Sequence, residues 1–207
     1  MKYVKMLGLA AVAAAALMAF VGASSASASV LCKTAPNAEG KCAAGWGFSG
    51  EIHATTTEKP KLTSTFKTVE CDESTVKGNA TEGTGSPTET PNGAATLSFT
   101  GHCNCTVVVA SGGTLEIHAI GDTGNGTVTS NGATVTIQCS TIFGAVHCNY
   151  VTNNKDIGTL VGGTPATMNI TIKIEEEATS SLCDAEATWH GNYSVTTPTG
   201  LWVATST

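Results

Sequence analysis

The sequence predicts an all-β protein, an antiparallel β-sandwich of immunoglobulin-like or jelly-roll-like type with about ten to twelve short strands. Three observations predict this class. Apolar and polar residues alternate along many short segments, turn-forming residues separate those segments, and no segment keeps a helical period for more than two turns. A barrel is compatible with the same pattern, and the sandwich is our expectation.

The first residues have the features of a secretory signal peptide. Two lysines precede an apolar run from Met6 to Val21, and Ala26-Ser27-Ala28 provides a small-residue cleavage site. We therefore expect a signal helix within residues 1–28 and a single mature domain at 29–207 that is secreted, either extracellular or at the cell surface. The apolar run is shorter than the roughly 20 residues of a membrane-spanning helix, and the mature chain offers no longer run.

The composition argues against two classes of partner. The formal charge is −6, and it becomes −8 when the two lysines of the signal peptide are removed; the chain contains no Arg. Such an acidic chain repels nucleic acid and anionic membranes. We expect neither as a partner.

The alternation places strands along the chain from Gly50 onward, whereas Ser29–Phe48 has no clear period. A compact apolar run at Thr106–Ala110 should be buried on both faces. Turns are expected at Gly112-Gly113, at Gly121–Gly126 and at Asn131-Gly132, and an exposed loop at Gly83–Gly93. The other predicted strands are Gly50–Thr56, Lys61–Cys71, Thr75–Glu82, Ala95–Thr100, Thr114–Ile120, Ala133–Cys139, Val146–Val151, Ala166–Ile174, Ala187–Thr196 and Leu201–Thr205.

The stretch from Ala133 to Val151 predicts a hairpin with a covalent link. Its first half alternates up to Cys139, and its second half alternates through Cys148 after a turn near residues 141–145. Antiparallel pairing of the halves places Cys139 and Cys148 on one face. The pattern therefore predicts a disulfide between them.

All eight cysteines follow the cleavage site, and an even count in an oxidising compartment predicts four disulfides. Cys32 and Cys42 close a short N-terminal loop. A bridge between Cys103 and Cys105 needs a bend at Asn104, because residues two apart in an extended strand are roughly 6.5 to 7 Å apart at their Cα atoms. The alternatives pair these two residues with Cys71 and Cys183. We favour Cys71–Cys183 together with a tight Cys103–Cys105 ring.

Metal binding is the alternative for part of this cysteine set. His102, Cys103 and Cys105, together with His147 and Cys148, combine thiols with imidazoles, which suits zinc or copper. Zinc sites usually space their cysteines two to four residues apart, and the compartment favours disulfides. We therefore expect no metal and no other cofactor.

No catalytic motif is present in the sequence. It lacks G-x-S-x-G, H-E-x-x-H and a phosphate-binding loop, and Asp122–Gly126 matches a calcium loop only at its start. The Glu175–Glu177 run could join Asp184 and Glu186 in a cation site, although a solvated strand end is the simpler interpretation. We expect no enzymatic activity. A secreted glycan hydrolase is the alternative, since one sequence does not reveal carboxylates that distant strands bring together.

Aromatic residues provide the one candidate for ligand contact. Trp189 is in phase with Tyr193 and Val195 and should pack in the core, whereas Trp46 lies between two glycines in a loop and could present its ring to a sugar. We therefore predict a secreted, non-catalytic binding or structural protein. Its expected partner is a glycan or cell-wall polysaccharide, and the second class is a surface protein bound at a sheet edge.

The chain also resembles a group of small secreted proteins from actinobacteria of the Solirubrobacterales type, which have no assigned activity. The similar features are Leu31-Cys32-Lys33, the F-K-T-V-E-C of Phe66–Cys71, paired cysteines before an apolar strand at Cys103–Val109, the Cys139–Cys148 pair, and the Y-S-V-T-T-P-T of Tyr193–Thr199. The resemblance spans most of the mature chain. It implies secretion and β-structure and assigns no functional residue.

Overall fold

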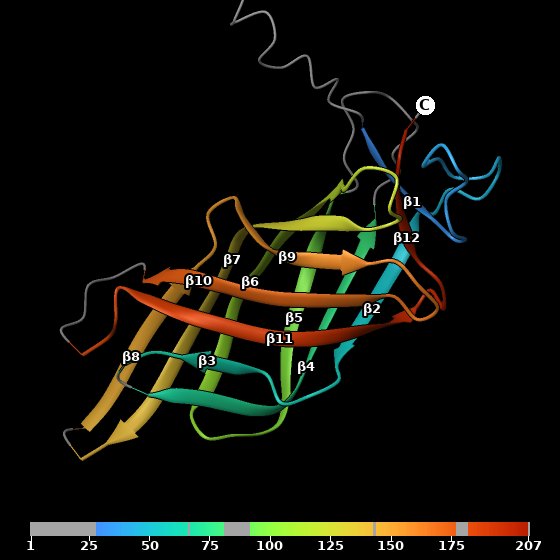
Figure 1. Cartoon of the computed structure of the whole chain (residues 1–207). Coiled ribbons are helices and arrows are strands. Elements are labelled where there is room, and N and C mark those ends of the chain that lie inside the picture. Colours follow the sequence, from blue (N-terminus) through green and yellow to red (C-terminus); the bar gives the residue numbers. More distant parts are fainter. Residues whose placement is uncertain (1–27, 66, 81–91, 143, 177–181, 207) are drawn as a thin grey trace, which may run out of the picture.

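The computed structural model describes residues 28–65, 67–80, 92–142, 144–176 and 182–206, which form twelve β-strands (Figure 1). This part of the chain contains no helix long and apolar enough to cross a membrane. The predicted signal helix lies outside the described residues, as does most of the predicted Gly83–Gly93 loop.

Ten of the strands form one antiparallel sheet whose spatial order follows the chain. Two short strands, β2 and β3, pair with the same two neighbours and share one position in the sheet, and β8 and β9 share another in the same way. The ten strands therefore fill eight positions. They are β2 (Gly50–Thr56), β3 (Lys61–Thr63), β4 (Thr68–Ala80), β5 (Asn92–Cys103), β6 (Thr106–Ala119), β7 (Gly126–Thr141), β8 (Gly144–Val151), β9 (Lys155–Val161), β10 (Thr167–Glu176) and β11 (Glu186–Thr197).

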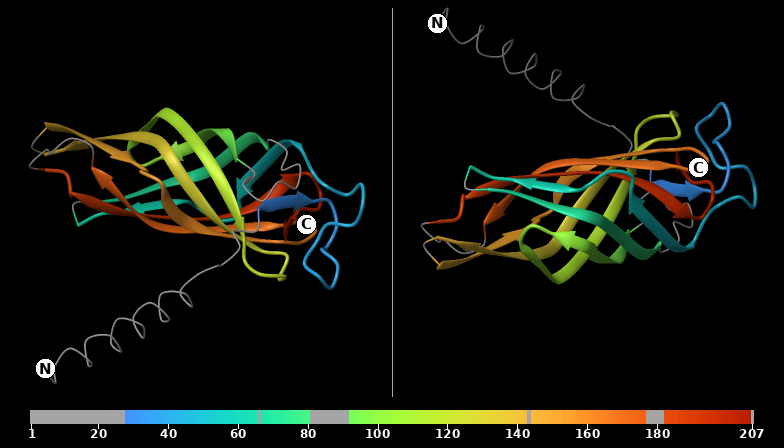
Figure 2. Two further views of the ribbon diagram at one scale, coloured as in Figure 1. Left: turned by 90° about the horizontal axis from the view of Figure 1, so that it is seen from above. Right: turned by 90° about the horizontal axis from the view of Figure 1, so that it is seen from below.

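The sheet closes into a barrel because its last strand returns to its first. Strand β11 pairs with β10 along one edge, and along the other it pairs with β2 through Tyr193 and Thr56 and with β3 through Trp189 and Leu62. Figure 2 shows a flattened ring, with β10 and β11 along one side and the green strands β5 and β6 on the opposite side.

Alternation along the strands gives the barrel an apolar interior. On β10, Met168, Ile170, Ile172 and Ile174 are buried while the residues between them face solvent, as the sequence predicts. On β11, Tyr193 and Val195 are buried on the same inner face. Trp189 packs beside them, edge-to-face with Phe99 of β5 at a centroid distance of 5.3 Å.

A two-stranded ribbon covers one end of the barrel. Strands β1 (Ser29–Cys32) and β12 (Trp202–Thr205) pair with each other and not with the barrel sheet. The Ser29 hydroxyl accepts a hydrogen bond from the backbone N–H of Ala119, at the end of β6, at 2.7 Å. Leu31 of β1 and Val203 of β12 are fully buried. We call this ribbon the cap.

The predicted all-β, disulfide-linked fold is confirmed, but the sheet arrangement differs from the expectation. The strands form a closed barrel in place of the two separate sheets of a sandwich. The inward alternation is the same in both architectures, because each buries one face of every strand. The difference lies in the pairing of β11 with β2 and β3, which depends on contacts distant in the sequence.

Two predicted turns are bends within long strands. Gly112-Gly113 lies inside β6, and Asn131-Gly132 lies inside β7. Gly113 and Gly132 have φ values of +67° and +72°, and a Cβ at Gly113 would clash with the backbone of Asn131 and Ala133. The glycines therefore curve a paired ribbon, a use that barrels make of glycine. The predicted Gly121–Gly126 turn does connect β6 to β7.

The prediction that Thr106–Ala110 is buried on both faces is wrong. Exposure alternates along this segment, and Val108 is 44 % exposed. The reason is the architecture: β6 is a wall of a barrel, with one face toward the interior and one toward solvent.

All eight cysteines are in disulfides, but only one predicted pair is correct. Cys32–Cys42 is confirmed. The predicted pairs Cys139–Cys148, Cys71–Cys183 and Cys103–Cys105 are wrong. The structure has Cys71–Cys103, Cys105–Cys139 and Cys148–Cys183. Four disulfides are typical of extracellular proteins.

Strand register explains the corrected pairs. Cys139 and Cys148 do share the inner face, but the tight turn between Thr141 and Gly144 pairs Cys139 with Val146 and leaves Cys148 two residues away. Cys71 lies directly opposite Cys103, with a Cα–Cα distance of 4.0 Å. Cys105, one step beyond the Thr106–Gln138 pair, lies opposite Cys139 at 4.8 Å.

The double substitution Cys71→Ala and Cys103→Ala should lower the free energy of unfolding by about 4 kcal/mol on the chain-entropy model. Removing Cys32 and Cys42 in the same way should cost only about 3 kcal/mol, since the sequence separations of the two pairs are 32 and 10 residues. Urea unfolding followed by circular dichroism measures both. A larger loss for the shorter loop would contradict this order.

Candidate functional site

The side chains do not completely fill the barrel interior. A cavity of about 100 Å³ lies between β4, where Val69 and Val76 line it, and β10 and β11, where Ile172 and Trp189 line it. Among the residues that the structure describes, none that lines this cavity carries a charge. Eight strands make a barrel just wide enough either for its own side chains or for one small ligand. We call this space the main cavity.

A second cavity of about 70 Å³ lies nearer the cap. Leu31 of β1 and Leu201 before β12 line it at that end, and Ile117 and Val128 form part of its wall. Lys77 is the one charged residue among the described residues that line it, and its side chain is on the exposed face of β4. We call this space the cap cavity.

The buried polar groups of the interior are satisfied by one another. The Tyr193 and Ser74 hydroxyls are 3.1 Å apart, and those of Ser130 and Thr152 are 2.9 Å apart. Among the described residues, no buried side-chain nitrogen or oxygen lacks a hydrogen-bond partner. The two cavities therefore offer a guest carbon surface and few free polar partners.

Burial keeps the Tyr193 hydroxyl neutral. Desolvation raises the pKa of Tyr193 to about 12, against the smaller opposing effect of hydrogen bonds with Ser74 and Trp189. A phenolate in this interior would lose its hydration without gaining a cation. The group therefore has a structural role as a hydrogen-bonded anchor between β11 and β4.

The barrel wall is incompletely paired between β5 and β6. Register pairs join these strands only at Asn92–Ala94 with Thr114–Glu116. Beyond that point, no register pairs join residues 95–103 to residues 106–113, although Gly112 still lies against the backbone of Ala95 and Thr96. We call this interval the seam. Leu97 and Phe99 on one side and Val107 on the other line the main cavity, so the seam borders it.

Disulfides fix the strands on either side of the seam. Cys103 joins β5 to β4, and Cys105 joins β6 to β7. Between them, the Asn104 side chain accepts a hydrogen bond from the Glu70 N–H at 3.0 Å and donates one to the Thr68 carbonyl at 3.0 Å. The turn that ends the seam is therefore anchored to β4 and to β7.

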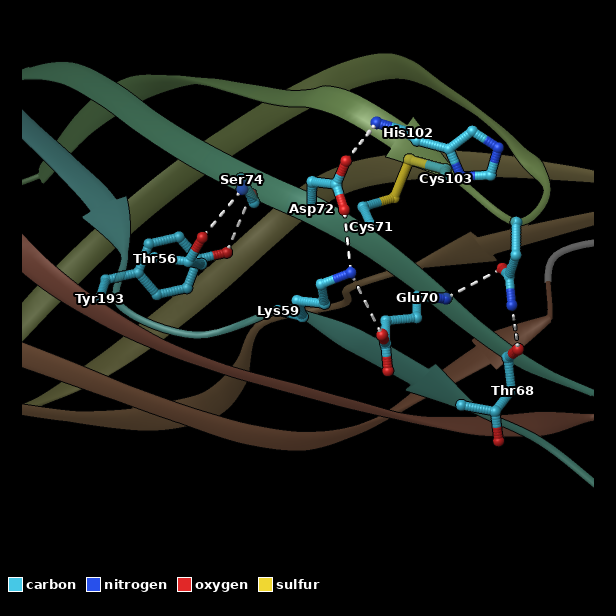
Figure 3. The surroundings of a disulfide bond; sticks show 11 residues. Thr56, Lys59, Thr68, Glu70, Cys71, Asp72, Ser74, His102, Cys103 and Tyr193 are labelled. Atoms are coloured by element: carbon cyan, nitrogen blue, oxygen red, sulfur yellow. Dashed lines mark hydrogen bonds and ion pairs between the residues drawn. A yellow bond between two sulfur atoms is a disulfide. The ribbon is translucent and has the colours of Figure 1, made fainter.

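Charged groups on the outer surface reinforce this anchor. The Asp72 carboxylate accepts a hydrogen bond from the His102 N–H at 2.8 Å and pairs with Lys59 Nζ at 3.0 Å (Figure 3). The His102 backbone N–H, followed by Lys59, lowers the pKa of Asp72. These groups are exposed, so they position β4 against β5 and add little stability.

Trp46 lies where the sequence places it, in the loop between β1 and β2. Its side chain is 48 % exposed. Its backbone N–H donates to the Ala43 carbonyl and its carbonyl accepts from the Lys33 N–H, both at 2.9 Å. The loop is thus ordered around an exposed ring, and sugar binding by that ring stays a prediction.

The cysteine and histidine set has no thiolate to offer a metal. Cys103, Cys105 and Cys148 are all in disulfides, and His147 is on the exposed face of β8. In the acidic set, Glu175 pairs with Lys155, while Glu186 pairs with Lys173 at 3.1 Å. Within the described residues, no group of three or more His, Cys, Asp or Glu side chains converges on a possible metal position.

One surface cluster has the connectivity of a catalytic triad. His190 Nδ1 is 2.9 Å from the Thr171 hydroxyl, and its Nε2 is 3.1 Å from the Glu58 carboxylate. The three residues are on the outer face, and Thr171 is the cross-strand partner of His190. Neither cavity reaches them, so nothing there would hold a substrate or stabilise an oxyanion. We interpret the cluster as a cross-strand contact.

The chain matches no family model, no curated protein and no solved structure in the comparisons with known proteins.

Sequence reasoning missed the cavities and the seam. The signal that points to them is the small size of several inward residues, such as Ala95, Gly112 and Ala133, all of which line the main cavity. Small side chains on the inner face of one wall leave a cavity only when the side chains of the opposite wall are too short to fill the space. That condition depends on the registers of strands far apart in the sequence.

Raising the pH should destabilise the protein through Tyr193. An unfolded tyrosine loses its proton near pH 10, while the native side chain has a pKa of about 12. The native state keeps this proton to a higher pH than the unfolded state does. The contribution of Tyr193 to the free energy of unfolding is therefore fully present below about pH 10, and it falls by up to about 2.7 kcal/mol as the pH rises to about 12.

Urea unfolding at a series of pH values measures this loss, with Tyr193→Phe as the comparison. The variant should be less stable at neutral pH by about 1 kcal/mol, because the Ser74 hydroxyl loses its partner. It should then lose less stability than the native chain between pH 10 and 12. Parallel pH profiles for the two proteins would contradict the assignment.

Proposed function

We propose that this chain is a secreted, non-catalytic binding protein whose barrel holds a small apolar molecule. The observation that carries the proposal is a closed barrel with two cavities lined almost wholly by carbon. Natural cores are usually packed to the density of organic crystals. This fold is stabilised by four disulfides and yet leaves its interior unfilled. That combination is consistent with an interior that has evolved to hold a bound molecule.

The physical driving force for such binding is hydrophobic. Transfer of apolar surface from water is favourable by roughly 25 cal/mol per Å², and a roughly 150 Å³ apolar cavity engineered into another protein stays dry and binds benzene. Here Ile170, Ile172 and Leu115 line the main cavity. None of its described lining residues carries a charge. This lining favours a hydrocarbon guest over a polar one.

The seam supplies a route for exchange of the guest. In a fully paired barrel, a molecule can leave only through an end or by breaking ladder hydrogen bonds. Between residues 95–103 and 106–113 there is no register pairing to break, and Leu97 and Val107 border the main cavity on the two sides. A non-catalytic role is consistent with this interior, since no carboxylate or imidazole of the described part of the chain lines either cavity.

Filling the cavity should abolish binding. In Ala95→Leu the new side chain enters the space that both cavities share, whereas in Ala94→Leu it points to solvent from the neighbouring exposed position. Isothermal titration calorimetry with 1-hexanol should show binding to the native chain and to Ala94→Leu, and affinity reduced by about tenfold or more in Ala95→Leu. Equal affinity of the two variants, or no binding by the native chain, would refute the proposal.

The exposure of Trp46 favours a second candidate, a glycan or cell-wall polysaccharide on the outer surface. A pull-down on insoluble polysaccharides should retain the native chain and Trp46→Tyr, which keeps an aromatic face. Trp46→Ala should pass through. The half-exposed ring contributes little to the core, so circular dichroism should be unchanged in both variants. Retention of Trp46→Ala at the native level, or no retention of the native chain, would remove this candidate.

A further inference from the structure

The two cavities are stacked along the strands. On β4, the main cavity is lined by Val69 and Cys71, whereas the cap cavity is lined by Gly78 and Ala80, and Val76 between them borders both. The lining residues follow the same order along β6. Val107 lines the main cavity, Ile117 lines the cap cavity, and Leu115 borders both. The combined space is therefore long in the direction of the strands and narrow across them.

Four side chains separate the two cavities. Val76, Ala95, Leu115 and Met168 border both spaces. Val76, Ala95 and Leu115 come from the neighbouring strands β4, β5 and β6, and Met168 comes from β10, four positions around the eight-position barrel from β5. A long methionine on one wall thus faces an alanine on the opposite wall.

Met168 is suited to act as a movable partition. It is buried, with 6 % of its surface exposed, among apolar neighbours. Methionine is unbranched and has three rotatable bonds, so it adapts to irregular space at low cost. The other three dividers have short or branched side chains. Among the four dividers, Met168 therefore has the side chain that can turn with the least change to the barrel wall.

The volumes limit the shape of the guest. Neither cavity, at about 100 and about 70 Å³, reaches the roughly 150 Å³ of the engineered benzene site, but together they slightly exceed it. A compact ring of that size would therefore be excluded from each cavity. A slender chain could extend through both.

We infer that the guest is an unbranched alkyl or acyl chain that lies along the strands and occupies both cavities when Met168 turns aside. About six to eight carbons fill the joined space, on the scale set by the benzene site. This inference rests on the proposed function, and it adds the shape and chemical class of the ligand. The remainder of a longer chain, or its polar end, would lie toward the seam, where the wall is unpaired.

The experiment is a calorimetric titration with straight-chain 1-alkanols from butanol to decanol, together with cyclooctanol as a compact eight-carbon probe. The dissociation constant should fall about fourfold for each added methylene until about eight carbons, and then level off. Cyclooctanol should bind at least about tenfold more weakly than 1-octanol. If the two eight-carbon probes bind equally, the elongated site is refuted.

Met168→Ile tests the partition, because isoleucine has a similar volume but is stiff at its first torsion. In this variant the gain with chain length should stop near four carbons, where the main cavity is full. Met168→Leu, which keeps an unbranched Cβ, should retain most of the native dependence. Thermal unfolding checks that both variants fold.

The outcomes separate the two proposals. If no alkanol binds the native chain, the proposed function fails and the inference fails with it. If alkanols bind the native chain and Met168→Ile keeps the full chain-length dependence, the binding function stands and the role of Met168 is refuted.

Discussion

Closure of the sheet by β11 is the interaction on which the rest of this structure depends. The strand pairs with β10 on one side and with β2 and β3 on the other, so residues near the end of the chain complete a wall begun near its start. Closure removes the exposed edges that an open sheet would present. It also encloses a common interior, and Tyr193 on this strand ties that interior to β4 through Ser74.

The hollow interior and the disulfides are complementary features. An unfilled cavity forgoes the dispersion contacts that a packed core would make, and the seam between β5 and β6 forgoes ladder hydrogen bonds. Cross-strand disulfides from Cys71 to Cys103 and from Cys105 to Cys139 hold both margins of that seam. Covalent links at both margins therefore hold these strands in place, although no register pairs join them across the seam.

Local pattern predicted which residues face inward, and it could not predict register. The alternation at Met168–Ile174 and the shared face of Trp189 and Tyr193 follow from the two-residue period of a strand. The Cys139–Cys148 error arose because a tighter turn at Thr141–Gly144 moved one strand by two residues, which preserves the face and changes every partner. The cavity depends on eight such registers together, so single segments of sequence do not reveal it.

The cap joins the two ends of the folded chain, since β1 begins at Ser29 and β12 ends at Thr205. Leu31 of β1 lies opposite Val203 of β12, and both side chains are buried. Burial at this end of the barrel therefore depends on two segments that lie more than 160 residues apart in the sequence. Loss of either strand would leave the apolar surface of the other exposed to solvent.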